Sequence, residues 1–240
     1  MKKIRFLLLA LLLVAIPKSL WAYTKDQIVP FGDMTYKVLV PNGNKPTLMF
    51  LGTTKSGALE IPAEVKDGAG TTFTVTEVAG DTRYPCKDVT SVTLPNTIKE
   101  LGINCFSGAT RLESINIPAS VEKINPVAFG DLRTVPVFTV DPANSHFSSD
   151  ANGVLYSNDK TKLWNVPTAI AEKINSNTYT VDPAVTNINR GAFPAHANLT
   201  KVILPEGLKE VDQVYPPIAT TNTLLEFEIA ESNPKFKVVA

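Results

Sequence analysis

The chain has 240 residues, of which 44% are hydrophobic and 19% are charged, with 23 basic and 23 acidic side chains. This hydrophobic content is that of a folded protein, and the balanced charge argues against nucleic acid and anionic membrane surfaces as partners. After residue 22 no apolar run is long enough to cross a membrane.

Residues 1–22 have the pattern of a secretory signal peptide. A basic front of Lys2, Lys3 and Arg5 precedes an apolar run over residues 6–16, and Ala22 ends a passable cleavage site. The segment is too short and wrongly flanked for a stable membrane anchor. Its removal would leave 19 basic against 23 acidic residues. We therefore expect an exported, mildly acidic protein of the periplasm, cell surface or medium, with no membrane insertion after cleavage.

Residues 23–57 lie outside the repeats that follow and are expected to form a small β-hairpin cap. Met34 to Val40 alternates polar and apolar residues as a half-buried strand does, and a turn-forming stretch occupies 41–46. Thr47 to Leu51 provides the second strand. A solenoid needs a cap over the apolar face of its first coil, and this hairpin is placed to supply it.

A repeat of about 23 residues organises residues 58–240. Leu94 and Ile117 are 23 residues apart, and so are Phe106 and Phe129, which indicates stacked coils. Each copy begins with a strand marked by apolar residues at offsets 0, 3 and 5. A proline or Asp-Pro usually ends this strand. A phenylalanine closes several coils, and these rings are expected to stack as an aromatic spine. The triplets are Val89/Val92/Leu94, Leu112/Ile115/Ile117, Val135/Phe138/Val140, Leu199/Val202/Leu204 and Leu224/Phe227/Ile229, with weaker versions at Ser56/Leu59/Ile61 and Ser176/Tyr179/Val181.

The period is interrupted between Val140 and Val181, which are 41 residues apart. The additional segment, residues 144–167, predicts one inserted β-hairpin followed by an irregular coil. The Asn-x-x-Phe that opens this insert recurs at 233–236, a few residues before the sequence stops at Ala240. We therefore expect the last repeat to be incomplete.

The repeat phrase L-x-x-I-x-I-P, followed by V-x-x-I and A-F, resembles the BspA-like family of bacterial leucine-rich repeats, as does the insert with N-x-x-F and G-V-L-Y. The resemblance covers roughly Ala58 to Ala240 and is clearest in Val89–Leu132 and Asn144–Leu204. It departs at Asp81–Cys86 and Tyr215–Pro217, where the closing Ala-Phe is lost, so distorted coils are expected there. The resemblance implies a β-rich leucine-rich-repeat solenoid at the exterior of Bacteroides-type bacteria. Members are often linked with adhesion or binding, and no shared catalytic residues are implied.

Few residues suggest chemistry. His146 and His196 are the only histidines, and neither has a second ligand at a metal-like spacing. The oxygen-rich stretches at 150–153 and 158–159 could hold calcium, but turn formation explains them at least as well. No nucleophile elbow or phosphate loop is present, and 67–70 has the composition of a turn. We expect no cofactor, no metal and no enzymatic activity.

Cys86 and Cys105 would lie in a compartment where a disulfide can form. The repeat register, however, places them at different points of neighbouring coils. A disulfide needs Cα atoms within roughly 7 Å, so two small buried thiols are the favoured interpretation.

The residues between the inward-facing strand positions are expected to line one continuous sheet face, the usual binding surface of a solenoid. They are mostly small, neutral and hydroxyl-bearing, which suits hydrogen bonding to a protein or glycan. The alternative is that Ser and Thr are acceptable exposed strand residues that bind nothing. The candidate binding residues are Ser91, Thr93, Ser114, Asn116, Thr139, Thr178, Thr180 and Lys201.

Two functions follow from these features. The first is an exported, non-enzymatic interaction module that binds an unidentified protein or glycan through the repeat sheet. The second is a structural or scaffold protein that forms a weak homo-oligomer through the open end of its solenoid, because an uncovered sheet edge invites pairing.

Overall fold

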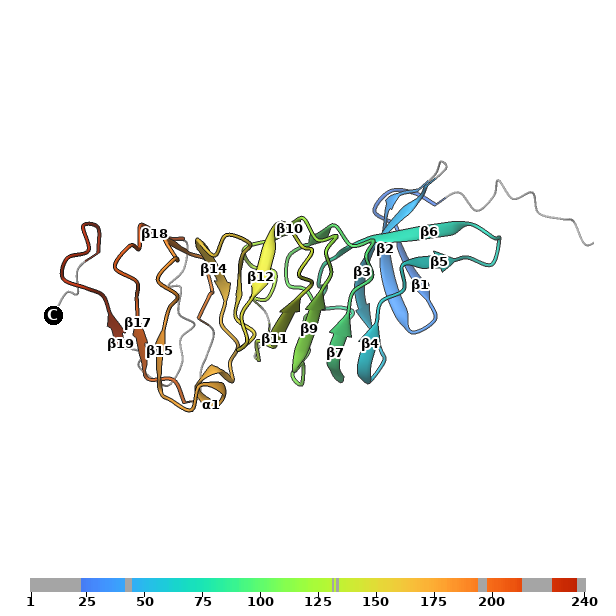
Figure 1. Cartoon of the computed structure of the whole chain (residues 1–240). Coiled ribbons are helices and arrows are strands. Elements are labelled where there is room, and N and C mark those ends of the chain that lie inside the picture. The colour runs from blue at the N-terminus through green and yellow to red at the C-terminus, as the bar shows by residue number, and fades with distance from the viewer. Residues whose placement is uncertain are drawn as a thin grey trace, which may run out of the picture.

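The computed structural model describes residues 23–41, 45–130, 132, 134–193, 198–212 and 226–236. Several features of the sequence lie outside these residues: the expected signal peptide at 1–22, His196, Leu224 and the departure at Tyr215–Pro217. The described chain forms an elongated β-solenoid with a β cap at one end, as expected (Figure 1).

All seven expected repeat strands are present, and they run parallel along one side of the solenoid (Figure 1). Four of them form one sheet in the order β11-β9-β7-β4, and three form a second sheet in the order β15-β17-β19. We call these sheets the first and the second ladder. Their strands are β4 (Gly57–Glu60), β7 (Val89–Thr93), β9 (Ser114–Ile117) and β11 (Val137–Val140), then β15 (Thr178–Thr180), β17 (Lys201–Ile203) and β19 (Glu226–Glu228).

The return segments of the coils form two-residue strands on the other side. Their apolar residues, such as Leu101 and Ile188, point into the core and are buried, as the second apolar pair of each repeat predicts. Successive return strands also pair in parallel, with Glu100 opposite Lys123 and Asn187 opposite Glu210. These strands are β8 (Glu100–Leu101), β10 (Lys123–Ile124), β16 (Asn187–Ile188) and β18 (Glu210–Val211).

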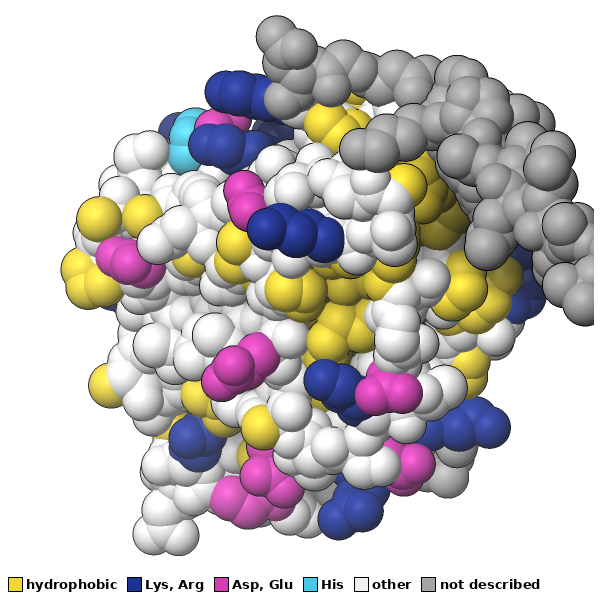
Figure 2. Space-filling model, turned by 90° about the vertical axis from the view of Figure 1, so that its right-hand side faces the viewer, with side chains coloured by type: hydrophobic (Ala, Val, Ile, Leu, Met, Phe, Trp, Pro, Cys, Tyr) yellow, Lys and Arg dark blue, Asp and Glu magenta, His cyan; other side chains and the backbone are white. Residues whose placement is uncertain are grey.

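The cap is larger than the expected hairpin. The two expected strands, β2 (Met34–Val40) and β3 (Thr47–Thr53), pair antiparallel, and β1 (Ile28–Phe31) adds to β2. In addition, β3 pairs in parallel with β6 (Thr72–Val78). Strand β6 also pairs antiparallel with β5 (Glu64–Lys66) and in parallel with β8. One sheet therefore runs from the cap into the return side of the solenoid. Seen from the cap end, hydrophobic side chains gather at the centre of the face, with charged side chains around them (Figure 2).

The insert contains the expected hairpin and one further strand, and it also interrupts the ladder. Its strands are β12 (Phe147–Ser149), β13 (Leu155–Ser157) and β14 (Lys162–Asn165), and each pairs antiparallel with the next. Strand β14 also pairs in parallel with β16 on the return side. Where the next ladder strand would lie, the chain forms a short helix, α1 (Ile170–Lys173). The expectation of one continuous sheet face is therefore wrong, because the coil that would bridge β11 and β15 supplies no strand.

The core is lined by the apolar residues of the triplets. The closing phenylalanines Phe106, Phe129 and Phe193 are buried, but their rings pack across the core on other elements. The ring of Phe129 lies 4.9 Å from that of Phe138 on β11, and the ring of Phe193 lies 6.2 Å from that of Tyr179 on β15. The ring contacts of Phe129 and Phe193 thus join coil ends to strands, and no ring contact is described between the closing phenylalanines of the expected spine.

Both cysteines are free and buried, which confirms the favoured interpretation. The thiol of Cys105 lies 3.3 Å from the carbonyl oxygens of Val78 and Gly102 and donates toward them. Burial raises the pKa of both thiols, to about 11 for Cys86. Low solvent exposure and raised pKa values make these side chains packing residues, because the reactive form of a cysteine is the thiolate.

Candidate functional site

Five of the eight candidate binding residues lie together on the outer face of the first ladder. Their strands are in register, so Ser91 lies opposite Ser114, and Thr93 and Thr139 both lie opposite Asn116. The side chains of Thr93, Asn116 and Thr139 are exposed, whereas those of the two serines are half-buried. Because neighbouring strands lie about 4.8 Å apart, these side chains form two evenly spaced polar columns.

The polar atoms of these columns are unpaired within the described part of the chain. No described residue forms a hydrogen bond with the side chains of Ser91, Thr93, Ser114, Asn116 or Thr139. Each hydroxyl can donate one hydrogen bond and accept two, and the amide of Asn116 can do both. The first ladder therefore presents a regular array of free donors and acceptors on a rigid sheet.

The other three candidates lie on the second ladder, which differs in charge. Thr178 lies opposite Lys201, which in turn lies opposite Glu226. The ammonium of Lys201 contacts the carboxylates of Glu226 and Glu228, and the hydrogen bond to Glu228 raises the pKa of Lys201. Lys201 is therefore already committed to ion pairs, whereas Thr180 remains exposed.

A groove of about 650 Å³ opens at the interruption between the two ladders. Its walls come from the start of β9 and β11 on one side and from the segment leading into α1 on the other. The hydroxyl and amide of Thr168 both bond to the carbonyl oxygen of Val135, which fixes that segment against the first ladder. The polar or ladder-forming residues that line the groove are Arg111, Glu113, Thr134, Val137, Thr168 and Glu172.

The groove is continuous with the first ladder, because Val137 belongs to both and Glu113 directly precedes Ser114. Nothing in the sequence indicates this groove, for two reasons. The four residues of α1 are too few to show a helical periodicity. The walls also come from segments that are far apart in the chain.

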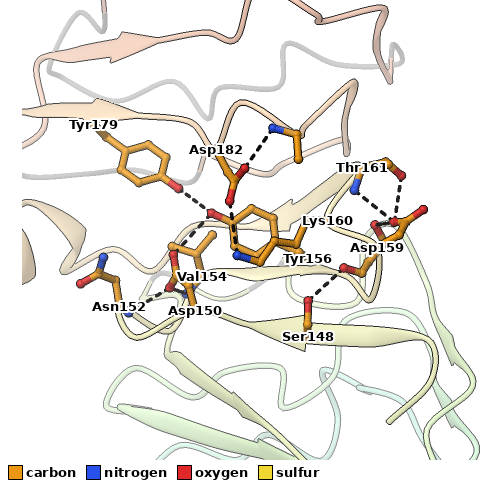
Figure 3. Close-up of polar contacts among 12 residues, drawn as sticks. Ser148, Asp150, Asn152, Val154, Tyr156, Asp159, Lys160, Thr161, Tyr179 and Asp182 are labelled. Carbon is orange, nitrogen blue, oxygen red and sulfur yellow. Dashed lines mark hydrogen bonds and ion pairs between the residues drawn. The ribbon is translucent and has the colours of Figure 1, made fainter. Parts of the chain in front are cut away.

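The insert is tied to the second ladder by a polar cluster (Figure 3). The hydroxyl of Tyr156 on β13 lies 3.0 Å from that of Tyr179 on β15 and 3.4 Å from Oδ2 of Asp150. Nearby, the ammonium of Lys160 lies 3.3 Å from Oδ2 of Asp182. Burial raises the pKa of Tyr179 to about 12, so its hydroxyl stays protonated at neutral pH. This cluster connects two parts of the fold.

The oxygen-rich turns of the insert act as turns. Oδ1 of Asp150 accepts the backbone amides of Asn152 and Val154, and Asp159 accepts the amide and the hydroxyl of Thr161 (Figure 3). These bonds use Oδ1 of each carboxylate to close the turn. Among the described residues, no three His, Cys, Asp or Glu side chains are grouped as metal ligands, and His146 is exposed.

The family follows from the repeats themselves. A model of the "BspA type Leucine rich repeat region" matches residues 76–179 and 167–215, with six copies. The chain belongs to the BspA-type leucine-rich repeat family. Within the described residues of this family member, no helix is long and apolar enough to cross a membrane. None of the curated proteins compared with the chain matches it.

Several solved structures are similar to this BspA-type chain. The pneumococcal vaccine antigen PcpA has 18% identity and a TM-score of 0.44, covering 84% of this chain and 72% of that one. A leucine-rich cell surface protein from Faecalibacterium prausnitzii has 14% identity and a TM-score of 0.43, covering 85% and 77%. A leucine-rich repeat protein from Bacteroides ovatus has 17% identity and a TM-score of 0.35, covering 77% and 53%.

Proposed function

We propose that this BspA-type protein is an exported, non-enzymatic interaction module that binds a protein or glycan through the outer face of the first ladder. The observation that carries the proposal is the set of polar side chains on this face that have no hydrogen-bond partner in the described chain. Family membership and the signal-peptide pattern of residues 1–22 support it.

The first ladder suits a partner that spans several strands. Short side chains on a paired sheet lose little conformational entropy when a ligand immobilises them. The adjoining groove offers a second contact, with apolar walls and the charged side chains of Arg111, Glu113 and Glu172 at its rim. A partner can therefore hydrogen-bond to the columns and place one larger group in the groove.

A matched pair of substitutions tests this proposal. Asn116→Arg adds a long charged side chain at the centre of the first ladder, and Thr180→Arg adds the same group at an exposed position of the second ladder. The purified protein is applied to arrays of host matrix proteins and of glycans. We expect binding that falls at least tenfold in Asn116→Arg and is unchanged in Thr180→Arg. Equal binding by both variants, or no binding by the unmodified protein, would refute the proposal.

The second candidate is a scaffold that self-associates through its C-terminal coils. Within the described residues β19 pairs with β17 only, and its Phe227 is half-buried. A strand edge of this kind can pair with another chain. Sedimentation velocity over a wide concentration range would then show a growing dimer fraction, whereas a strictly monomeric species at high concentration would exclude this role.

A further inference from the structure

A pocket of about 300 Å³ lies between the cap and the segments that lead into β4 and β7 of the first ladder. One wall is formed by Thr35 on β2 and by residues 53–55 at the end of β3, and the other by residues 83–88. That second segment lies where the chain departs from the family pattern and lacks the closing Ala-Phe. The departure therefore coincides with a cavity.

The walls of this pocket are held rigidly. The backbone of Tyr84 packs directly on β3, since a Cβ atom on Gly52 would lie 1.6 Å from the carbonyl oxygen of Tyr84. The amide of Tyr84 bonds to the carbonyl oxygen of Asp81, and the amide of Cys86 to that of Ser107. The loop is therefore fixed before any ligand arrives.

The pocket is positively charged in a chain with no net charge. Lys55, Arg83 and Lys87 line it with Asp88, and Asp81 balances the charge of Arg83, so two lysines stand against one acid. The guanidinium of Arg83 is held by both carboxylate oxygens of Asp81, at 3.0 Å and 2.6 Å, and lies 5.5 Å from the centroid of the Tyr84 ring. Among the described residues, neither lysine forms an ion pair, so both ammonium groups are available to an anion.

The remaining lining groups are hydroxyls and one aromatic ring. The hydroxyl of Thr53 is used within the fold, donating to the carbonyl oxygen of Asp33 and accepting the amide of Lys55. No described residue bonds to the hydroxyl of Thr35 or Thr54, and both line the pocket beside the half-buried Tyr84 ring. Free hydroxyls, an aromatic ring and two unpaired cations together match a polyol ring that carries a carboxylate.

We propose that this pocket binds a single carboxylated sugar residue, such as a uronic acid. The carboxylate bonds to the ammonium groups of Lys55 and Lys87, the ring hydroxyls bond to Thr35 and Thr54, and the apolar face of the sugar packs on Tyr84. A volume of about 300 Å³ is at the lower end of small-molecule sites, which fits one ring. Asp88 disfavours a second negative charge, so a densely anionic polymer fits less well than one acidic ring.

Calorimetric titration of the full chain tests the site, with glucuronate as the probe and glucose as the neutral control. We expect glucuronate to bind at least tenfold more tightly than glucose, with an affinity that falls as salt is raised. The double variant Lys55→Met/Lys87→Met should lose at least tenfold of this affinity. Lys209→Met, another exposed lysine without a described ion pair, should bind as the unmodified protein does.

Thermal unfolding of each variant checks that the fold is kept. We expect it to be kept because all three lysines are exposed. Equal binding of glucuronate and glucose, or full binding by the double variant, would overturn the proposal. Tighter binding of a glutamate-rich peptide than of glucuronate would show instead that the pocket selects acidic peptides. Failure of ladder binding would leave this result unaffected, because none of the ladder candidates lines the pocket.

Discussion

The hydroxyl oxygens of Tyr156 and Tyr179 lie 3.0 Å apart, and this hydrogen bond joins the inserted hairpin to the first strand of the second ladder. Both side chains are buried, and Tyr156 also reaches Asp150. The insert interrupts the ladder, so contacts of this kind hold the coils on either side of it together.

Removal of these hydroxyls should destabilise the solenoid by unequal amounts. Tyr179→Phe leaves Tyr156 bonded to Asp150 and should cost about 1 kcal/mol, whereas Tyr156→Phe deprives both partners and should cost about 2 kcal/mol. Urea unfolding followed by circular dichroism measures the difference. Tyr36→Phe is the control, because among the described residues this buried hydroxyl donates only to the sulfur of Met34, a weak acceptor, and should matter least. A larger loss in Tyr36→Phe would contradict this account.

Asn144 should be intolerant of an isosteric change to Asp. Its amide nitrogen donates to the carbonyl oxygens of Pro118 and Val121, and its Oδ1 accepts two backbone amides that open the insert. Asn144→Asp replaces a buried donor by an acceptor facing two carbonyl oxygens, which should cost about 3 kcal/mol. Asn96→Asp, at an exposed position, should leave the melting temperature nearly unchanged. Equal melting temperatures for the two variants would refute the prediction.

Gly153→Ala should weaken the contact between the insert and β11. Gly153 has a φ of +77°, and an added Cβ would lie 2.2 Å from Cγ1 of Val137. We expect a loss of about 2 kcal/mol from backbone strain and overpacking, measured by thermal unfolding. Gly191→Ala, with a φ of +75° and no atom within 4 Å of the added Cβ, shares the backbone strain without the contact and serves as the matched control. If both variants melt together, the close approach at Gly153 is not a constraint.

Alkaline pH should destabilise the fold through its buried thiols. Burial raises the pKa of Cys86 from 9.0 to about 11, so the unfolded chain loses its proton first as pH rises. This stabilising effect is complete below pH 9 and is lost between about pH 9 and 11. At pH 11 the loss of unfolding free energy reaches about 2 kcal/mol. Tyr36 and Tyr179, whose pKa values are raised from 10.0 to about 12, act in the same direction above pH 10.

Urea midpoints measured at pH 8, 9 and 10 test this dependence. Cys86→Ala removes one titrating group, so its midpoint should fall less steeply with pH than that of the unmodified protein. A midpoint that stays constant or increases up to pH 10 in the unmodified protein would contradict the prediction.

The repeats could be predicted from the sequence because their signals are local. Residues such as Leu94 and Ile117 recur at a fixed spacing, and each is followed by a proline that ends the strand. Within a ladder, inward-facing residues of neighbouring coils lie opposite each other, as Val92 and Ile115 do. The period alone therefore determined the ladder strands, their register and the residues that face outward.

Tertiary structure decided everything that depends on pairing between unlike segments. The repeat period does not predict the pairing of β6 with β3, the position of α1 or the division of the ladder. The groove beside Val137 and the cationic pocket beside Tyr84 are both formed by walls from segments distant in the chain. Side chains meet there only after the coils have stacked, so the sequence by itself determined the repeating surface, and the packing of its irregular parts decided where that surface is hollowed.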